Sequence, residues 1–190
     1  MSKVQKSTLY YPDRAPVQLQ VEVDLQSSPE EVWKALLDYP SWPKWFPNVK
    51  SCFETTPLPK VADNNPSYPL GSTRRIDIGG VVFDEEIIAC DDGSSLNDKE
   101  RQPKVWAFSV CETSKPILNC AVERVVLEPL YKENDESGTT VVGTRVRYAG
   151  GMDVVWYLPF LKPILKRNMK QAWKQGLERL DQYIIMQQNK

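Results

Sequence analysis

Hydrophobic and polar residues alternate one by one in several short stretches of the chain. Residues 17–24, VQLQVEVD, place valine and leucine at the odd positions, with glutamine, glutamate and aspartate between them. Alternation with a period of two is typical of a β-strand that has one buried and one exposed face. Gly79 and Gly80 separate two of the predicted strands and indicate a two-residue hairpin. Further strands are predicted at 49–55, 70–78, 81–90, 104–112, 118–130 and 139–150.

Two other parts of the chain have the periodicity of helices. The first begins with Ser28 as the N-cap, Pro29 at the first helical position and Glu31 three residues after the cap. It stops at Pro40, and a second short helical turn follows. The second helix is long, covers 158–188 and carries a broad apolar stripe. The residues of this stripe are Leu161, Leu165, Met169, Ala172, Trp173, Gly176, Leu177, Leu180, Tyr183 and Ile184.

The predicted order is one strand, two short helices, six consecutive strands and one long helix. Consecutive strands with hairpin-length connections form an antiparallel sheet, and helices can then cover one of its faces. We therefore predict an α+β fold in which a curved antiparallel sheet of about seven strands wraps around the long C-terminal helix. The length of 190 residues fits one domain, assigned to 17–187, with 1–16 as a flexible N-terminal extension.

The residue types that the composition lacks exclude more functions than the residue types that it contains. The chain has no histidine, so it lacks the usual general base near neutral pH and the commonest metal ligand. The four cysteines form no CxxC pair. We expect no metal and no organic cofactor, and the missing histidine favours a binding protein over an enzyme. With neither a signal peptide nor a long apolar run visible, we expect a cytoplasmic protein.

The N-terminal helical region and several strands carry recognisable motifs. They are PxxVW at 29–33, the W..W.P.V pattern of Trp42, Trp45, Pro47 and Val49, LGSTRR at 70–75, Glu86 followed by Ile87, and GTRVRY at 143–148. Through these motifs the chain resembles the START/Bet v 1-like (SRPBCC) superfamily over 17–187, and within it the polyketide cyclase/dehydrase and lipid-transport group.

This resemblance implies a helix-grip fold with an apolar cavity between the sheet and the long helix. The two short helices, which hold three of the six tryptophans, would pad one end of that cavity. The expected polar end consists of Arg74 and Glu86, because an arginine–glutamate pair could orient a ligand carbonyl or carboxylate. The expected apolar wall consists of Trp106, Phe108, Tyr148, Met169, Trp173 and Leu177, with Trp45, Phe46, Ile76, Val122, Arg124, Val146 and Trp156 as further contacts.

The predicted function is to bind a hydrophobic small molecule, such as a lipid, isoprenoid, quinone, pigment or polyketide, for transfer, storage or presentation. One alternative is a metal-free cyclase or dehydratase that uses a pocket glutamate, with Glu86 as the candidate. Another is an interaction module with a solid core. Aromatic and basic residues at 156–170 predict transient contact with an anionic membrane. The net charge of −1 and the absence of a basic strand face argue against nucleic acid.

Overall fold

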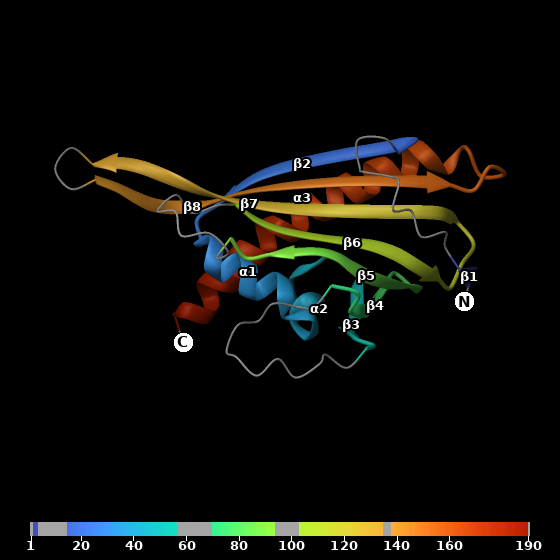
Figure 1. Ribbon diagram of the computed structural model, residues 1–190, viewed down its shortest axis with the longest axis horizontal. Coiled ribbons are helices and arrows are strands. Elements are labelled where there is room, and N and C mark those ends of the chain that lie inside the picture. The colour runs from blue at the N-terminus through green and yellow to red at the C-terminus, as the bar shows by residue number, and fades with distance from the viewer. Residues whose placement is uncertain (1, 4–14, 57–69, 94–102, 135–137, 190) are drawn as a thin grey trace.

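The computed structural model describes residues 2–3, 15–56, 70–93, 103–134 and 138–189 (Figure 1). The elements are β1 (Ser2–Lys3), β2 (Val17–Leu25), α1 (Pro29–Leu37), η2 (Tyr39–Ser41), α2 (Trp42–Trp45), β3 (Val49–Glu54), β4 (Thr73–Ile78), β5 (Val81–Asp91), β6 (Lys104–Thr113), β7 (Leu118–Asn134), β8 (Gly138–Val154) and α3 (Leu161–Gln188). Most of the predicted extension 1–16 lies outside these ranges, as do most of the residues between the predicted strands 49–55 and 70–78 and between the predicted strands 81–90 and 104–112.

The strands form one antiparallel sheet in the order β2-β8-β7-β6-β5-β4-β3, and β1 pairs with the C-terminal end of β6. The order is sequential except that β2 joins β8, so the first long strand of the chain lies beside the last one. Figure 1 shows this sheet curving along one side of α3, with α1 and α2 near the C-terminal end of that helix. The predicted helix-grip arrangement is therefore confirmed.

The β4–β5 hairpin determines which side chains of these two strands lie opposite each other. Gly79 and Gly80 both have a positive φ, 60° and 84°, which side chains other than glycine rarely adopt. This two-residue turn pairs Ile78 with Val81. In an antiparallel pair, residues at the same distance from the turn lie opposite each other. Arg74 therefore lies opposite residue 85.

The tryptophan-rich region forms the short helices that cover this end of the sheet. The Ser28 hydroxyl oxygen accepts a hydrogen bond from the Glu31 backbone N–H, and the Glu31 carboxylate accepts one from the Ser28 backbone N–H, so the predicted capping box is present. In α2, Trp42 is buried, and its indole N–H donates to the Leu36 carbonyl at 2.9 Å. Trp45 is buried beside it, with ring centroids 4.8 Å apart. The aromatic cluster therefore joins α1, α2 and the sheet into one core.

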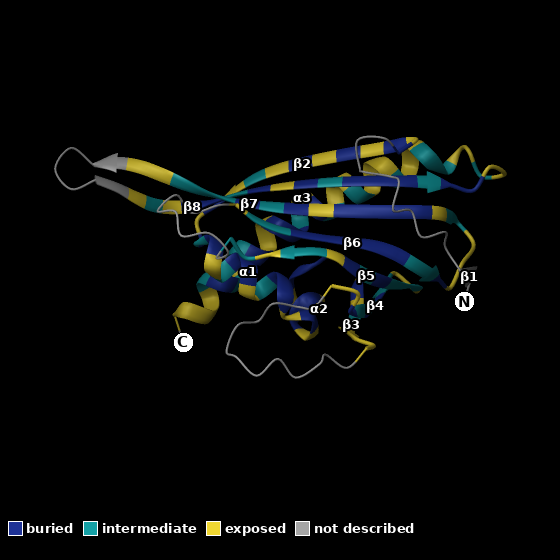
Figure 2. Ribbon diagram, in the orientation of Figure 1, coloured by how far each residue is buried: buried dark blue, intermediate teal, exposed yellow. Residues whose placement is uncertain are grey.

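Helix α3 is not equally covered along its length (Figure 2). Its fully buried residues, Trp173, Gly176, Leu177, Leu180 and Ile184, all lie in the C-terminal part and belong to the predicted stripe. Before Trp173 every residue of the helix is half-buried or exposed. The helix is therefore buried by the sheet, α1 and α2 in its C-terminal part and only partly covered at its beginning.

Strands β7 and β8 are longer than the sequence predicts. Strand β7 runs to Asn134, beyond the predicted end at 130, and β8 runs from Gly138 to Val154, whereas the prediction was 139–150. Strand β8 continues through the two glycines at 150 and 151. Because Gly150 has no side chain, it leaves room for a neighbouring side chain within the sheet. A Cβ at that position would lie 2.7 Å from the Tyr148 hydroxyl oxygen. The longer β8 carries the chain to the start of α3.

Candidate functional site

A cavity of about 180 Å³ lies between the sheet and the middle of α3, beside the loop that follows α2. Its volume is below the roughly 300–1,000 Å³ typical of pockets for drug-sized ligands. Most of its lining is apolar or aromatic, and three charged side chains reach it. The lining residues are Trp42, Phe46, Pro47, Asn48, Arg74, Ile76, Ile78, Glu85, Phe108, Glu123, Asn168, Met169, Ala172 and Trp173.

Arg74 of β4 is the most deeply buried charge of the site, with 1% of its surface exposed. Its Nε donates to Oε2 of Glu85 on the neighbouring strand at 2.7 Å. The guanidinium carbon lies 4.4 Å from the ring centroids of Trp42, Trp106 and Phe108, close enough for cation–π attraction. The rings shelter Nη1, which has no hydrogen-bond partner among the residues that the structure describes. Aromatic faces and one carboxylate therefore hold this arginine in place.

Glu123 of β7 brings a second buried carboxyl to the same cavity. It is 8% exposed, and its Oε2 accepts a hydrogen bond from the Trp173 indole N–H at 3.2 Å. Burial raises the pKa of Glu123 to about 7, and the negative charge of Glu85 acts in the same direction. Burial also raises the pKa of Glu85, against the opposing effect of Arg74. The cavity thus holds one guanidinium and two carboxyl groups, of which Glu85 is the one bonded to Arg74.

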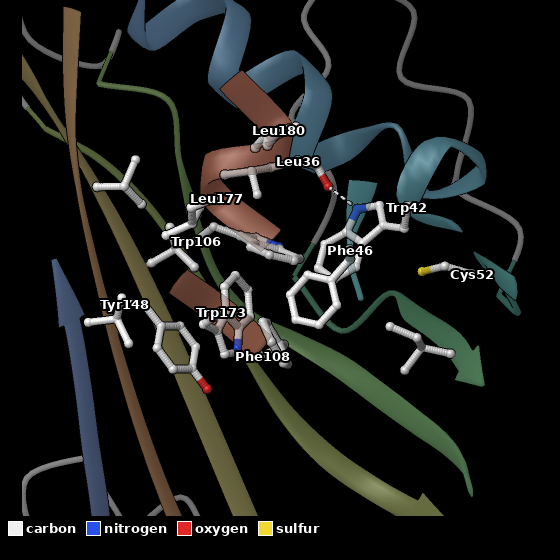
Figure 3. Close-up of a cluster of buried hydrophobic side chains, with 14 of the residues drawn as sticks. Leu36, Trp42, Phe46, Cys52, Trp106, Phe108, Tyr148, Trp173, Leu177 and Leu180 are labelled. Atoms are coloured by element: carbon white, nitrogen blue, oxygen red, sulfur yellow. Dashed lines mark hydrogen bonds between the residues drawn. The ribbon is translucent and has the colours of Figure 1, made fainter. Parts of the chain in front are cut away.

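Trp173 lies between Tyr148 and Phe46 in the aromatic core (Figure 3), and its indole N–H also bonds to Glu123. Its ring stacks on Tyr148 of β8, with centroids 4.0 Å apart, and meets Phe46 edge-on at 5.0 Å. Burial raises the pKa of Tyr148 well above its ordinary value, and the charge of Glu123 raises it further. The phenol therefore stays neutral near pH 7, and the cavity combines a caged cation, two carboxyl groups and aromatic walls.

The structure brings together many of the residues predicted from the sequence. Those that line the cavity are Phe46, Arg74, Ile76, Phe108, Met169 and Trp173. Those that are buried without lining it are Trp45, Trp106, Val122, Val146, Tyr148 and Leu177. Of this second group, Trp106 packs on the Arg74 guanidinium and Tyr148 stacks on Trp173, so both support lining residues.

Three predicted contacts lie elsewhere. The expected pair of Arg74 with Glu86 is wrong: the hairpin places Glu85 opposite Arg74, and Glu86 pairs with Thr73 and does not line the cavity. Arg124 is exposed, because alternation along β7 turns its neighbour inward instead. Trp156 is 85% exposed in the segment before α3.

Sequence reasoning missed both carboxyl groups that line the cavity. Glu85 could have been found from the turn at Gly79 and Gly80. A two-residue turn pairs residue 78 with residue 81, and four residues further along each strand residue 74 faces residue 85. For Glu123 there was no such signal. In LNCAVERVVLEPL each face carries apolar residues and at least one charge, so alternation alone does not identify the inner face.

Two further properties bear on what the site can do. Within the described residues no group of three or more histidine, cysteine, aspartate or glutamate side chains is arranged to hold a metal ion. Among the helices that the structure describes, none combines the length and hydrophobicity needed to span a bilayer. The chemistry visible in this part of the chain is that of carboxyl groups, a guanidinium and aromatic rings.

Comparison with known proteins gives a family and a fold. The family model described as "Polyketide cyclase / dehydrase and lipid transport" matches residues 16–184. Uncharacterized proteins from Mycobacterium bovis and Mycobacterium tuberculosis are 32% identical over 82 residues, 43% of this chain. The matched part of the chain covers 44% of the length of these curated relatives.

Solved structures extend the likeness over most of the chain. A START superfamily protein from Mycobacterium smegmatis aligns with a TM-score of 0.61 at 16% identity, covering 90% of this chain and 98% of that one. The structure of Ara h 8.0201 aligns with a TM-score of 0.60 at 13% identity, covering 89% and 97%. At such identities the likeness shows the fold alone, and it agrees with the helix-grip arrangement described above.

Proposed function

Because the chain belongs to the polyketide cyclase/dehydrase and lipid transport family, we propose that it binds a hydrophobic small molecule in the cavity for transfer, storage or presentation. The observation that carries the proposal is an apolar cavity with charged groups gathered in its wall. The fold family binds hydrophobic small molecules. Lipids, isoprenoids, quinones, pigments and polyketides are the ligand classes in question.

Leaving the cavity empty has an energetic cost. Engineered core cavities destabilise proteins by about 24 cal/mol per Å³. For about 180 Å³ this gives an upper limit of about 4 kcal/mol, because the cavity is partly open and water can enter it. This is a large fraction of the roughly 5–15 kcal/mol by which domains are stable. A ligand that fills the space therefore stabilises the folded protein.

The size of the cavity limits how a ligand is held. A volume of about 180 Å³ accommodates one ring or a short chain segment, so a larger lipid has to leave part of its length outside. Met169 and Ala172 line the cavity from the half of α3 that is only partly covered. Outward movement of this half of the helix gives a larger ligand access.

The test is to fill the cavity without removing core contacts. Ala172→Phe places a ring in the cavity, whereas Gln171→Phe places the same ring on the exposed side of α3 and is the matched control. Native mass spectrometry and organic extraction of the purified protein identify any bound molecule. We expect an apolar adduct on the parent protein and the Gln171→Phe variant, and none on Ala172→Phe. An equal adduct on all three places the ligand elsewhere.

Residues 156–170 support the membrane contact that belongs to this function. Trp156 is 85% and Phe160 62% exposed, although both are large hydrophobic residues. The segment 154–177 contains five basic and no acidic residues, namely Lys162, Lys166, Arg167, Lys170 and Lys174. The first turn of α3 has no acidic residue and its N-cap makes no side-chain hydrogen bond. Because cations near a helix N-terminus oppose the helix dipole, this charge does not serve helix stability.

Exposed aromatic residues beside lysines match the interface of an anionic bilayer, where each basic side chain contributes about 1 kcal/mol. Sedimentation with phosphatidylcholine vesicles, with and without phosphatidylglycerol, tests this contact. We expect salt-sensitive binding only to the anionic vesicles, and its loss in the double variant Trp156→Ala, Phe160→Ala. Tyr131→Ala, which removes an aromatic side chain with 51% exposure on β7, is the control. Equal binding by both variants contradicts the contact.

A second candidate function is metal-free acid–base catalysis, as in a cyclase or dehydratase. The observation in its favour is that Glu123, with a pKa of about 7, lies in the cavity wall and is poised for proton transfer near neutral pH. Glu86, the candidate from the sequence, does not line the cavity. Turnover of a polyketone that Glu123→Gln abolishes favours catalysis, and binding without turnover favours the carrier.

A further inference from the structure

The charges around the cavity do not balance when every group takes its ordinary form. Arg74 on β4 supplies one positive charge, and Glu85 on β5 and Glu123 on β7 supply two negative ones. Tyr148 on β8 also faces Glu123 and is neutral near pH 7. Arg74 is bonded to Glu85 at 2.7 Å, so Glu123 is the carboxyl whose charge is left without a direct ionic partner.

Burial decides how the imbalance is resolved. Each unpaired charge in a protein interior costs several kcal/mol, and a carboxyl group avoids this cost by keeping its proton. The arrangement with the fewest charges is therefore one ion pair, between Arg74 and Glu85, and one neutral acid, Glu123. The direction in which burial and Glu85 move the pKa of Glu123 agrees with this assignment.

A neutral carboxyl differs from a carboxylate in what it can bind. The carboxylate only accepts hydrogen bonds, whereas the neutral acid also has one O–H to donate. Glu123 already accepts from the Trp173 indole at one oxygen. The Tyr148 hydroxyl faces Glu123 and has no hydrogen-bond partner by distance among the described residues. Most of the remaining wall is apolar, so a ligand that brings an acceptor can take the O–H of Glu123.

We propose that the cavity takes a ligand whose inserted end is an uncharged carbonyl group, as in a ketone, quinone, ester or amide, and that Glu123 donates a hydrogen bond to its oxygen. The inference rests on the proposed function and names the ligand class for that cavity. A carboxylate end brings an unpaired negative charge beside Glu85, whose own charge is paired with Arg74. An ammonium end brings a buried cation beside Arg74 and accepts no hydrogen bond from Glu123.

Ligands of one chain length and different end groups test this choice. The probes are methyl hexyl ketone, octane, octanoate and octylamine, titrated calorimetrically against the full chain at about pH 6 and about pH 8. With a pKa of about 7, the neutral fraction of Glu123 falls about tenfold between these two values. We expect the ketone to bind more tightly than the other three at about pH 6, and to lose about tenfold in affinity at about pH 8.

Two variants separate the hydrogen bond from other effects of pH. Glu123→Gln keeps a neutral donor of nearly the same shape, so its affinity for the ketone should stay close to the parent value at about pH 6 and change little with pH. Glu178→Gln removes one exposed carboxylate from α3 and should keep the pH dependence of the parent.

The outcomes also separate this inference from the function on which it rests. Octane bound as tightly as the ketone, or octanoate or octylamine bound more tightly, overturns the carbonyl assignment but leaves a hydrophobic carrier. A ketone affinity that is the same at both pH values in the parent overturns the role of Glu123. Failure of all four probes, with no adduct in native mass spectrometry, contradicts the proposed function as well.

Discussion

Replacing Glu123 by glutamine should make the protein more stable at neutral and alkaline pH. The pKa of Glu123 is raised from 4.5 to about 7 in the folded protein, because ionisation places a charge in the buried wall of the cavity. At 1.36 kcal/mol for each pKa unit, this difference corresponds to about 3 kcal/mol. Glutamine keeps the oxygen that accepts from Trp173 and has no charge to bury.

The sign of the pH dependence follows from proton binding. Below about pH 4.5 Glu123 is protonated in both folded and unfolded chains, so its ionisation costs nothing. Between about 4.5 and about 7 the folded chain keeps a proton that the unfolded chain has lost, and stability falls as pH rises. Above about 7 the full cost of about 3 kcal/mol is present and the curve becomes level.

Urea unfolding followed by tryptophan fluorescence measures this effect. The free energy of unfolding is extrapolated to water at several pH values between about 4.5 and about 8 for the parent and for Glu123→Gln. The advantage of the variant should grow by about 3 kcal/mol across this window. Glu178→Gln, an exposed site on the same protein, should stay parallel to the parent. Parallel curves for Glu123→Gln and the parent would refute the assignment of a buried, raised-pKa carboxyl.

Two substitutions probe the packing around the site. Arg74→Met leaves Glu85 buried without its cation, and we expect a loss of about 3–5 kcal/mol in chemical unfolding. Adding Glu85→Gln should recover part of it, and no recovery would mean that Arg74 acts mainly through its aromatic contacts. Gly176→Ala adds a Cβ 2.9 Å from the Phe46 ring. We expect this to cost about 1–3 kcal/mol, more than the gain of about 1 kcal/mol in helix propensity, so a higher melting temperature would contradict the close packing.

Most of the elements of the fold could be predicted from the chain because their signals are local. The Ser28 capping box, the prolines after α1 and the glycine pair of the β4–β5 hairpin each act within a few residues, and all appear where expected. The apolar stripe of α3 required only the helical period. Even the opposition of Arg74 and Glu85 follows from the turn, since a two-residue hairpin determines the register of its strands.

Which face of a strand points into the core could not be predicted from local signals in two of the strands. In VVFDEEIIAC and LNCAVERVVLEPL both faces carry apolar residues together with charges, so the local pattern fits either orientation. The packing of the sheet against α3 decided that Glu85 and Glu123 point inward and that Arg124 points to solvent. Each choice moves a charge between water and a low-dielectric interior, which is why sequence-based site prediction failed at these positions.

The sequence by itself determined the helix-grip architecture, the aromatic padding around Trp42 and the basic, aromatic segment before and within α3. Only the tertiary structure decided that Arg74, Glu85 and Glu123 meet at one small cavity, where Arg74 is bonded to Glu85. The physical reason is that a period or a cap depends on neighbours in the chain. The charge state of Glu123 depends on the three elements that bring Arg74, Glu85 and Trp173 around it, and on the water they exclude.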